Sequence, residues 1–189
     1  ERTLRETYDC LDPQKRAEGV RAAADAVRAG RCVVLPTDTV YGIGCDAFSA
    51  PGVQGLLGAK GRTREMPPPV LIARPEVMDA LADQVSEDAR ALAEAFWPGA
   101  LTLVCWAQPS LGWDLGETGG TIAVRMPDDP TALALLRATG PMAVTSANHT
   151  GEPPATDATS GIAAFPGRVT PASEAADDVD ILLLDGGPT

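Results

Sequence analysis

Three basic side chains alternate along the stretch KGRTREMPPP, namely Lys60, Arg62 and Arg64. In an extended chain alternate residues point to the same side, so these three cations would line one wall. Like charges gather at a cost unless an anion is present, and phosphate groups suit such an arrangement. On spacing alone, a solvated loop is the simpler explanation. However, Lys60 is one of only two lysines in a chain that otherwise uses arginine, which favours a need for a compact point charge.

A further cation, Arg125, interrupts the apolar stretch TIAVRMP between Val124 and Met126. A charge inside a strand is tolerated when it is paired or faces a cavity. Arg125 could therefore bind a substrate carboxylate, or it could form a structural pair with one of the 26 acidic residues. The sequence leaves both interpretations open.

Two more stretches place polar side chains directly after apolar strands. PTDTVYG (36–42) follows CVVL, and VTSANHTGEPP (144–154) carries Ser146 and Asn148 where another strand ends. Open α/β sheets bind ligands at the carboxyl ends of their strands. Ordinary turn chemistry would also explain both stretches. Within them, Asp38 is left open between a cap and a site role, and His149 has no predicted role.

Several familiar kinds of site are missing from the sequence. GIGCDA (42–47) matches a dinucleotide fingerprint, but Phe48, Ser49 and Pro51 delay the next helix, whose N-terminus should meet the pyrophosphate. No phosphate-binding G-x-x-x-x-G-K-[ST] loop and no G-x-S-x-G elbow occurs. One histidine and four cysteines without C-x-x-C spacing argue against zinc. We predict no metal held by protein side chains alone.

The elements that must position these residues alternate between helices and strands. Hydrophobic spacing and capping residues predict helices at 15–30, 50–60, 86–96 and 129–140. Apolar runs predict strands at 32–36, 69–73, 100–107, 121–126, 142–146 and 179–187. Near-continuous apolar strands are typical of burial on both faces. We therefore expect an α/β fold, a twisted open mixed sheet flanked by helices in a single domain of residues 1–189.

The overall composition limits the possible partners. With 189 residues and a net charge of −11, the chain suits one acidic domain. That charge disfavours broad contact with RNA or anionic membranes, so direct tRNA binding is not expected. No apolar run approaches the roughly 20 residues of a membrane span. Cysteines set in apolar runs favour a reduced, cytoplasmic protein.

Taken in order, these motifs resemble the YrdC-like family of threonylcarbamoyl-AMP synthases, in particular the stand-alone bacterial type. The matching stretches are VVLPTDTVYGIGCDAF, AKGRTREMPPPVLI, FWPGALTLV, TIAVRMP, MAVTSANHTGEPP and DGGPT. The resemblance implies a nucleotidyltransferase that joins L-threonine, bicarbonate and ATP into threonylcarbamoyl-AMP with release of pyrophosphate. Mg²⁺ would accompany ATP, and a separate transferase complex would use the product for the t6A modification of tRNA at position 37.

The resemblance also implies roles for single residues. Lys60 and Arg62 would contact the ATP phosphates and act in catalysis. Thr121, Ser146 and Asn148 would line the nucleotide region. Thr39, Tyr41 and Arg125 would hold threonine. This set suits a reaction between two anions, which needs positioning and positive charge more than a protein nucleophile.

The sequence departs from the family pattern at three places. Thr63 replaces a common proline, so we expect a more mobile loop, and Leu71 replaces a histidine that contacts threonine in many members. The family also continues beyond DGG into a closing segment, whereas this chain stops at Thr189. We therefore expect that segment to be absent. Two alternatives remain: the carbamoyl-adenylate-forming domain of a carbamoyltransferase, and an RNA-binding module.

Overall fold

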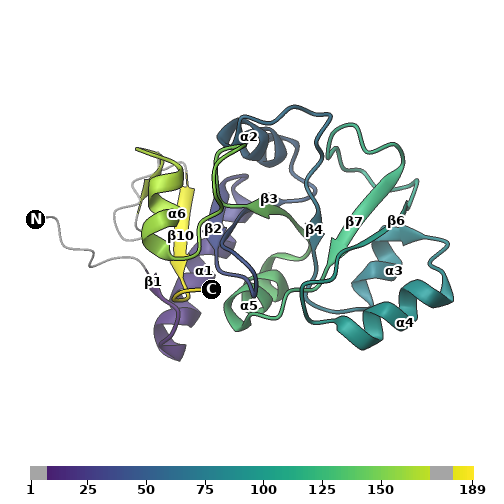
Figure 1. The fold of residues 1–189 in the computed structure, drawn as a ribbon, viewed down its shortest axis with the longest axis horizontal. Helices are drawn as coiled ribbons and strands as arrows, with labels where there is room; N and C mark the ends of the chain where they lie inside the picture. The colour runs from purple at the N-terminus through teal and green to yellow at the C-terminus, as the bar shows by residue number, and fades with distance from the viewer. Residues whose placement is uncertain (1–7, 171–180) are drawn as a thin grey trace, which may run out of the picture.

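The computed structural model describes residues 8–170 and 181–189 (Figure 1). The helices are α1 (Pro13–Arg28), α2 (Ala50–Lys60), α3 (Val77–Leu81), α4 (Glu87–Phe96), α5 (Pro130–Thr139) and α6 (Ala158–Ala164). The strands are β1 (Tyr8–Asp9), β2 (Cys32–Leu35), β3 (Gly42–Asp46), β4 (Val70–Leu71), β5 (Ala82–Asp83), β6 (Leu103–Ala107), β7 (Thr121–Arg125), β8 (Met142–Ser146), β9 (Val169–Thr170) and β10 (Ile181–Asp185). None of the helices in these ranges is long and apolar enough to cross a membrane.

The predicted helices form because their ends carry the expected caps. The Ser49 hydroxyl accepts a hydrogen bond from Gly52 N at the start of α2, and Ser86 does the same for Ala89 N at the start of α4. Helix α2 ends at Lys60 because Gly61 adopts a left-handed conformation, with φ of 63°. The cap at Gly61 therefore sets where the Lys60 side chain leaves the helix.

The strands form one mixed sheet in the order β1-β10-β2-β3-β8-β4-β7-β6-β5, with β9 beside β10. The pairs β10–β2 and β4–β7 are parallel, whereas β2–β3, β3–β8 and β6–β7 are antiparallel. The predicted mixed α/β sheet is therefore confirmed. Because β3 returns antiparallel to β2, the GIGCDA stretch forms a central strand and no dinucleotide loop.

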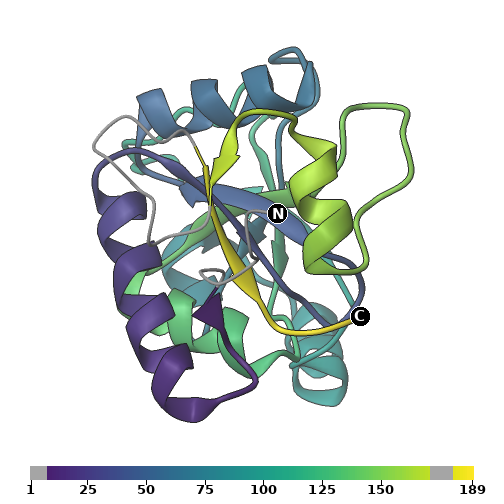
Figure 2. The same ribbon diagram turned by 90° about the vertical axis from the view of Figure 1, so that its left-hand side faces the viewer.

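The helices cover the sheet unevenly. Helices α1 and α5 pack on one face of β10, β2 and β8, while α2, α3, α4 and α6 contribute to the core on the other face. Figure 2 shows α1 and α6 on opposite sides of the strands. On the α1–α5 side, β6 and β7 have no covering helix, so Val104 and Trp106 remain 71% and 61% exposed. Burial on both faces, expected for several strands, holds for β2 but not for β6, whose residues alternate between buried and exposed positions.

The sequence analysis did not predict the shortest elements. β1, β3, β5, β9, α3 and α6 were not predicted, because two to seven residues give too little periodicity to recognise. The predicted strand at 69–73 is only two residues long, Val70–Leu71. The last predicted strand is found at Ile181–Asp185, while its first two positions, 179–180, lie outside the described residues.

Candidate functional site

A cavity of about 190 Å³ lies where several strands and loops of the sheet meet. The loop after β2 forms one wall, the end of β8 another, and Arg125 at the end of β7 a third. Its lining consists of Thr37, Thr39, Val40, Tyr41, Gly42, Pro69, Leu71, Thr102, Arg125, Val144, Thr145 and Ser146. The volume is below the range of about 300–1,000 Å³ typical of pockets for drug-sized ligands, so it suits a smaller molecule.

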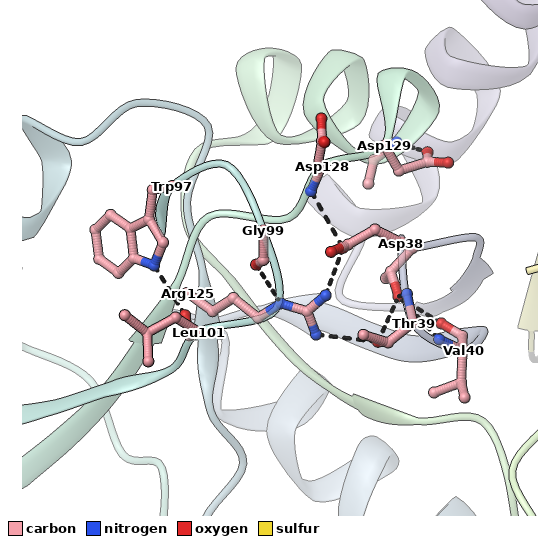
Figure 3. Close-up of polar contacts among 11 residues, drawn as sticks. Asp38, Thr39, Val40, Trp97, Gly99, Leu101, Arg125, Asp128 and Asp129 are labelled. Atoms are coloured by element: carbon pink, nitrogen blue, oxygen red, sulfur yellow. Dashed lines mark hydrogen bonds and ion pairs between the residues drawn. The ribbon is translucent and has the colours of Figure 1, made fainter. Parts of the chain in front are cut away.

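Three neighbouring groups hold the guanidinium of Arg125 at the edge of this cavity (Figure 3). Its Nε donates to Gly99 O at 3.0 Å, its Nη1 donates to Thr39 Oγ1 at 3.2 Å, and its Nη2 forms an ion pair with Asp38. The guanidinium has five N–H groups, so two stay available for a ligand. The structure thus shows the structural pair that the sequence left open, while Arg125 still faces the cavity.

Lys60 is the buried cation of the site. The residue is 3% exposed, and its Nζ donates to Ser146 O at 2.6 Å and to Asn148 Oδ1 at 2.9 Å. Among the described residues it has no acidic partner within ion-pair distance. Burial, and secondly the nearby charge of Arg62, lower the pKa of Lys60 to about 8. A buried cation with neutral partners only is a strong attractor for an anion.

Arg62 and Arg64 point to different surroundings. Arg62 Nη1 donates to Thr145 Oγ1 at 2.9 Å, which places it at the end of β8 beside the cavity. Arg64 instead forms an exposed ion pair with Asp114 at 2.7 Å. The expectation that three cations line one wall is therefore wrong. Lys60 and Arg62 both donate to residues at the end of β8, whereas Arg64 tethers its loop to the segment around Asp114.

Tyr41 lines the cavity, as expected, but its hydroxyl is engaged elsewhere. The hydroxyl donates to Gly187 O at 2.8 Å and accepts from Gly186 N at 3.0 Å. Burial raises the pKa of Tyr41. Tyr41 therefore anchors the turn after β10 and offers the cavity its ring rather than its hydroxyl.

Gly42 and Leu71 shape the cavity by size and polarity. A Cβ on Gly42 would lie 2.6 Å from Val144 Cγ1, so glycine permits the close approach of β3 to β8. Gly42 therefore belongs to strand β3, where a side chain would not fit, rather than to a turn. Leu71 is 3% exposed and gives the cavity an apolar wall at the position where the resemblance implies a histidine.

The remaining predicted residues lie at varied distances from the cavity. Ser146 lines it, while Asn148 is 8% exposed and acts as a hydrogen-bond partner of Lys60. Thr121 begins β7 and donates to Thr118 O at 2.9 Å. It lies on the same face of β7 as Arg125 but four residues earlier, which corresponds to about 13 Å along a strand. The exposed His149 packs its ring over Gly61.

Sequence reasoning missed several contributors to the site. The Thr37 hydroxyl donates to Val40 O and accepts from the N–H groups of Thr39 and Val40, which folds the loop after β2. Asp38 binds Arg125, and Thr145 binds Arg62. The polar motifs that contain Asp38 and Thr145 indicated that these residues could belong to a site. A local sequence pattern cannot, however, identify a partner more than 80 residues away in the chain.

The lowered pKa of Lys60 predicts a pH-dependent affinity for polyphosphate. Below pH 8 most Lys60 side chains are protonated and would attract phosphate, whereas above that pH they increasingly lose their charge. We expect the Kd for a non-hydrolysable ATP analogue, measured by titration calorimetry, to rise up to about tenfold per pH unit above the pKa. In Lys60→Arg, whose guanidinium stays charged, this rise should disappear. If the wild type and Lys60→Arg showed the same pH dependence of the Kd, Lys60 would not be the group whose charge attracts the polyphosphate.

Comparisons with known proteins identify relatives of this chain. The model of the Sua5, YciO and YrdC proteins, described as "Telomere recombination", matches residues 25–176. A Mycobacterium tuberculosis (strain H37Rv) protein assigned as a threonylcarbamoyl-AMP synthase is 52% identical over 155 residues, which cover 82% of this chain and 71% of the relative. The threonylcarbamoyl-AMP synthase of Bacillus subtilis (strain 168) is 38% identical over 181 residues, 94% of this chain and 47% of that protein.

Solved structures share the same fold. The crystal structure of P. abyssi Sua5 complexed with L-threonine superposes with a TM-score of 0.77 at 34% identity, over 94% of this chain and 48% of that one. E. coli YciO gives a TM-score of 0.75 at 22% identity, over 92% of this chain and 79% of YciO. Full-length HypF gives 0.71 at 18% identity, over 88% and 24% of the two chains, which shows a common fold only.

Proposed function

The chain belongs to the Sua5/YciO/YrdC family and is a threonylcarbamoyl-AMP synthase, and we propose that it binds L-threonine in the cavity beside Arg125 and ATP at Lys60 and Arg62. One observation carries this proposal. Ser146 lines the cavity, and its carbonyl oxygen also accepts the hydrogen bond from Lys60 Nζ. A cavity for a small carboxylate and a buried cation for phosphates therefore adjoin each other at the end of β8.

The proposed reaction begins in the cavity. Two free N–H groups of Arg125 would bind the threonine carboxylate, while Thr39 offers its hydroxyl to a polar group of the substrate. The apolar walls at Leu71 and Val144 would accept the substrate methyl group. The amine then takes up carbon from bicarbonate, forming an N–C bond and releasing water, which leaves a carbamate.

The second step joins two anions. A carbamate oxygen attacks the α-phosphorus of ATP, the bond to the β-phosphate breaks, and pyrophosphate leaves. Lys60 and Arg62 would neutralise the triphosphate and hold it against the carbamate, which is the main requirement of such a reaction. Mg²⁺ would enter with ATP, because proteins usually bind this ion through substrate phosphates.

The wider setting of the enzyme is also part of the proposal. Its product would serve a separate transferase complex that forms t6A in tRNA. We place the enzyme in the cytoplasm, which suits four cysteines that all lie in the described residues and form no disulfide. Thr121 and Asn148 remain proposed nucleotide contacts, with Asn148 acting through its bond to Lys60.

A pyrophosphate-release assay tests this function. With ATP and Mg²⁺ present, we expect release only when both L-threonine and bicarbonate are added, and we expect threonylcarbamoyl-AMP by mass spectrometry. Release that does not depend on threonine would contradict the proposal. If carbamoyl phosphate could replace threonine and bicarbonate, the carbamoyltransferase alternative would be favoured instead.

A further inference from the structure

Among the described residues, Asp38 is the one acidic side chain that forms an ion pair with the guanidinium of Arg125. Its carboxylate forms the ion pair with Arg125 Nη2 and also accepts from Asp128 N at 3.1 Å (Figure 3). The side chains of Asp38 and Arg125 are only 18% and 14% exposed, unlike the other ion pairs of the described residues, which are about half exposed or more. The pair is therefore shielded from solvent and should hold a fixed geometry.

The backbone fixes Asp38 independently of Arg125. The loop that carries it is folded by the Thr37 hydroxyl, and the N–H of Asp128 holds one carboxylate oxygen from the far side. Asp128 immediately precedes the cap of α5, where Asp129 accepts from Thr131 N and Ala132 N. Asp38 is thus a rigid acceptor, supported by two segments of the chain that are about 90 residues apart.

Arg125 without such an acceptor would be poorly placed. A guanidinium at the end of a long flexible side chain binds a carboxylate well only when its planar fork is held in one orientation. The contacts to Gly99 and Thr39 fix two of its nitrogens, and Asp38 fixes the third. Asp38 itself does not line the cavity. It can therefore affect a ligand there only through the groups that it holds.

We propose that Asp38 is a positioning residue, which orients the Arg125 guanidinium for the threonine carboxylate and neutralises its charge when the cavity is empty. This inference rests on the proposed function, since it takes threonine to be the ligand at Arg125. A positioning role of Asp38 differs from that of a purely structural ion pair in the substrate that is affected. Loss of Asp38 should weaken the use of threonine specifically, with little effect on ATP.

The test compares Asp38→Ala, Arg125→Ala and the double variant in the pyrophosphate assay. We expect Asp38→Ala to lower kcat/KM for threonine about tenfold or more, because small misplacements of a binding group have effects of this size. The KM for ATP should stay within twofold of the wild type. In the Arg125→Ala background, Asp38→Ala should cause no further loss. Asp38→Asn, which keeps an oxygen acceptor, should recover part of the activity.

Asp79→Ala serves as the matched control, because it breaks the exposed ion pair with Arg90, and neither residue lines the cavity. It should leave both substrates unaffected. An unchanged threonine kcat/KM in Asp38→Ala would overturn the proposal, as would an equal loss with and without Arg125 or a parallel loss for both substrates. If the wild-type protein shows no threonine-dependent release and no thermal shift with threonine, the proposed function itself fails. Normal wild-type behaviour with an unaffected Asp38→Ala would reject the role of Asp38 alone.

Discussion

Replacing Lys60 by alanine should lower kcat/KM for ATP by about 100- to 1,000-fold, the usual effect of removing one charge-stabilising group from an active site. The reason is the surroundings of Lys60. It is 3% exposed, its hydrogen-bond partners among the described residues are all neutral, and it lies beside Arg62. Its charge is therefore poorly compensated in the free protein, and the triphosphate would supply the missing counter-charge.

The fold should survive this substitution. Alanine leaves Asn148 Oδ1 without its donor, but it also removes a buried charge whose desolvation opposes folding. We expect a thermal midpoint within a few degrees of the wild type, measured by circular dichroism. Lys15→Ala is the natural control, because Lys15 is the other lysine and lies exposed on α1. Normal turnover of Lys60→Ala would remove Lys60 from phosphate binding.

Replacing Arg125 by alanine should lower kcat/KM for threonine by at least about 30-fold. The reason is the loss of the charge pair between Arg125 and the threonine carboxylate, since truncating one partner of such a hydrogen-bonded pair costs about 2–5 kcal/mol. The substitution removes the fork that would bind the substrate carboxylate. It also leaves the shielded Asp38 carboxylate without its cation. We therefore expect a loss of stability of about 1–3 kcal/mol in urea unfolding, less than for a fully buried pair.

Comparing the kinetic constants for threonine and for ATP distinguishes a loss of threonine binding from a general loss of enzyme structure. The KM for ATP should change little in Arg125→Ala, since Lys60 and Arg62 keep their contacts to β8. Arg137→Ala is the control, because Arg137 is an exposed arginine in the last turn of α5. Equal losses for ATP and threonine, or a threonine kcat/KM like that of the control, would contradict the proposed role of Arg125.

Local signals were enough to predict the type of fold and many of its elements. Helix α2 was recognisable from Ser49, Pro51 and the small and apolar residues between them and Lys60, because capping and packing act within a few positions. β2 and β8 were recognisable because a continuous apolar run needs burial on both faces. The strand β3 was not recognised, since the glycines in GIGCD have low strand propensity. They are required by the close approach of β8, above all of Val144, which the sequence does not reveal.

By itself, the sequence determined the residue types of the site and the family to which the chain belongs. PTDTVYG, KGR and TSAN each carry their polar groups whatever the partners turn out to be. Only the tertiary structure decided which groups meet: Arg125 pairs with Asp38, Lys60 with Ser146 and Asn148, and Arg64 turns away to Asp114. The physical reason is that an ion pair depends on distances set by sheet order, and strand order brings together residues that are more than 80 positions apart.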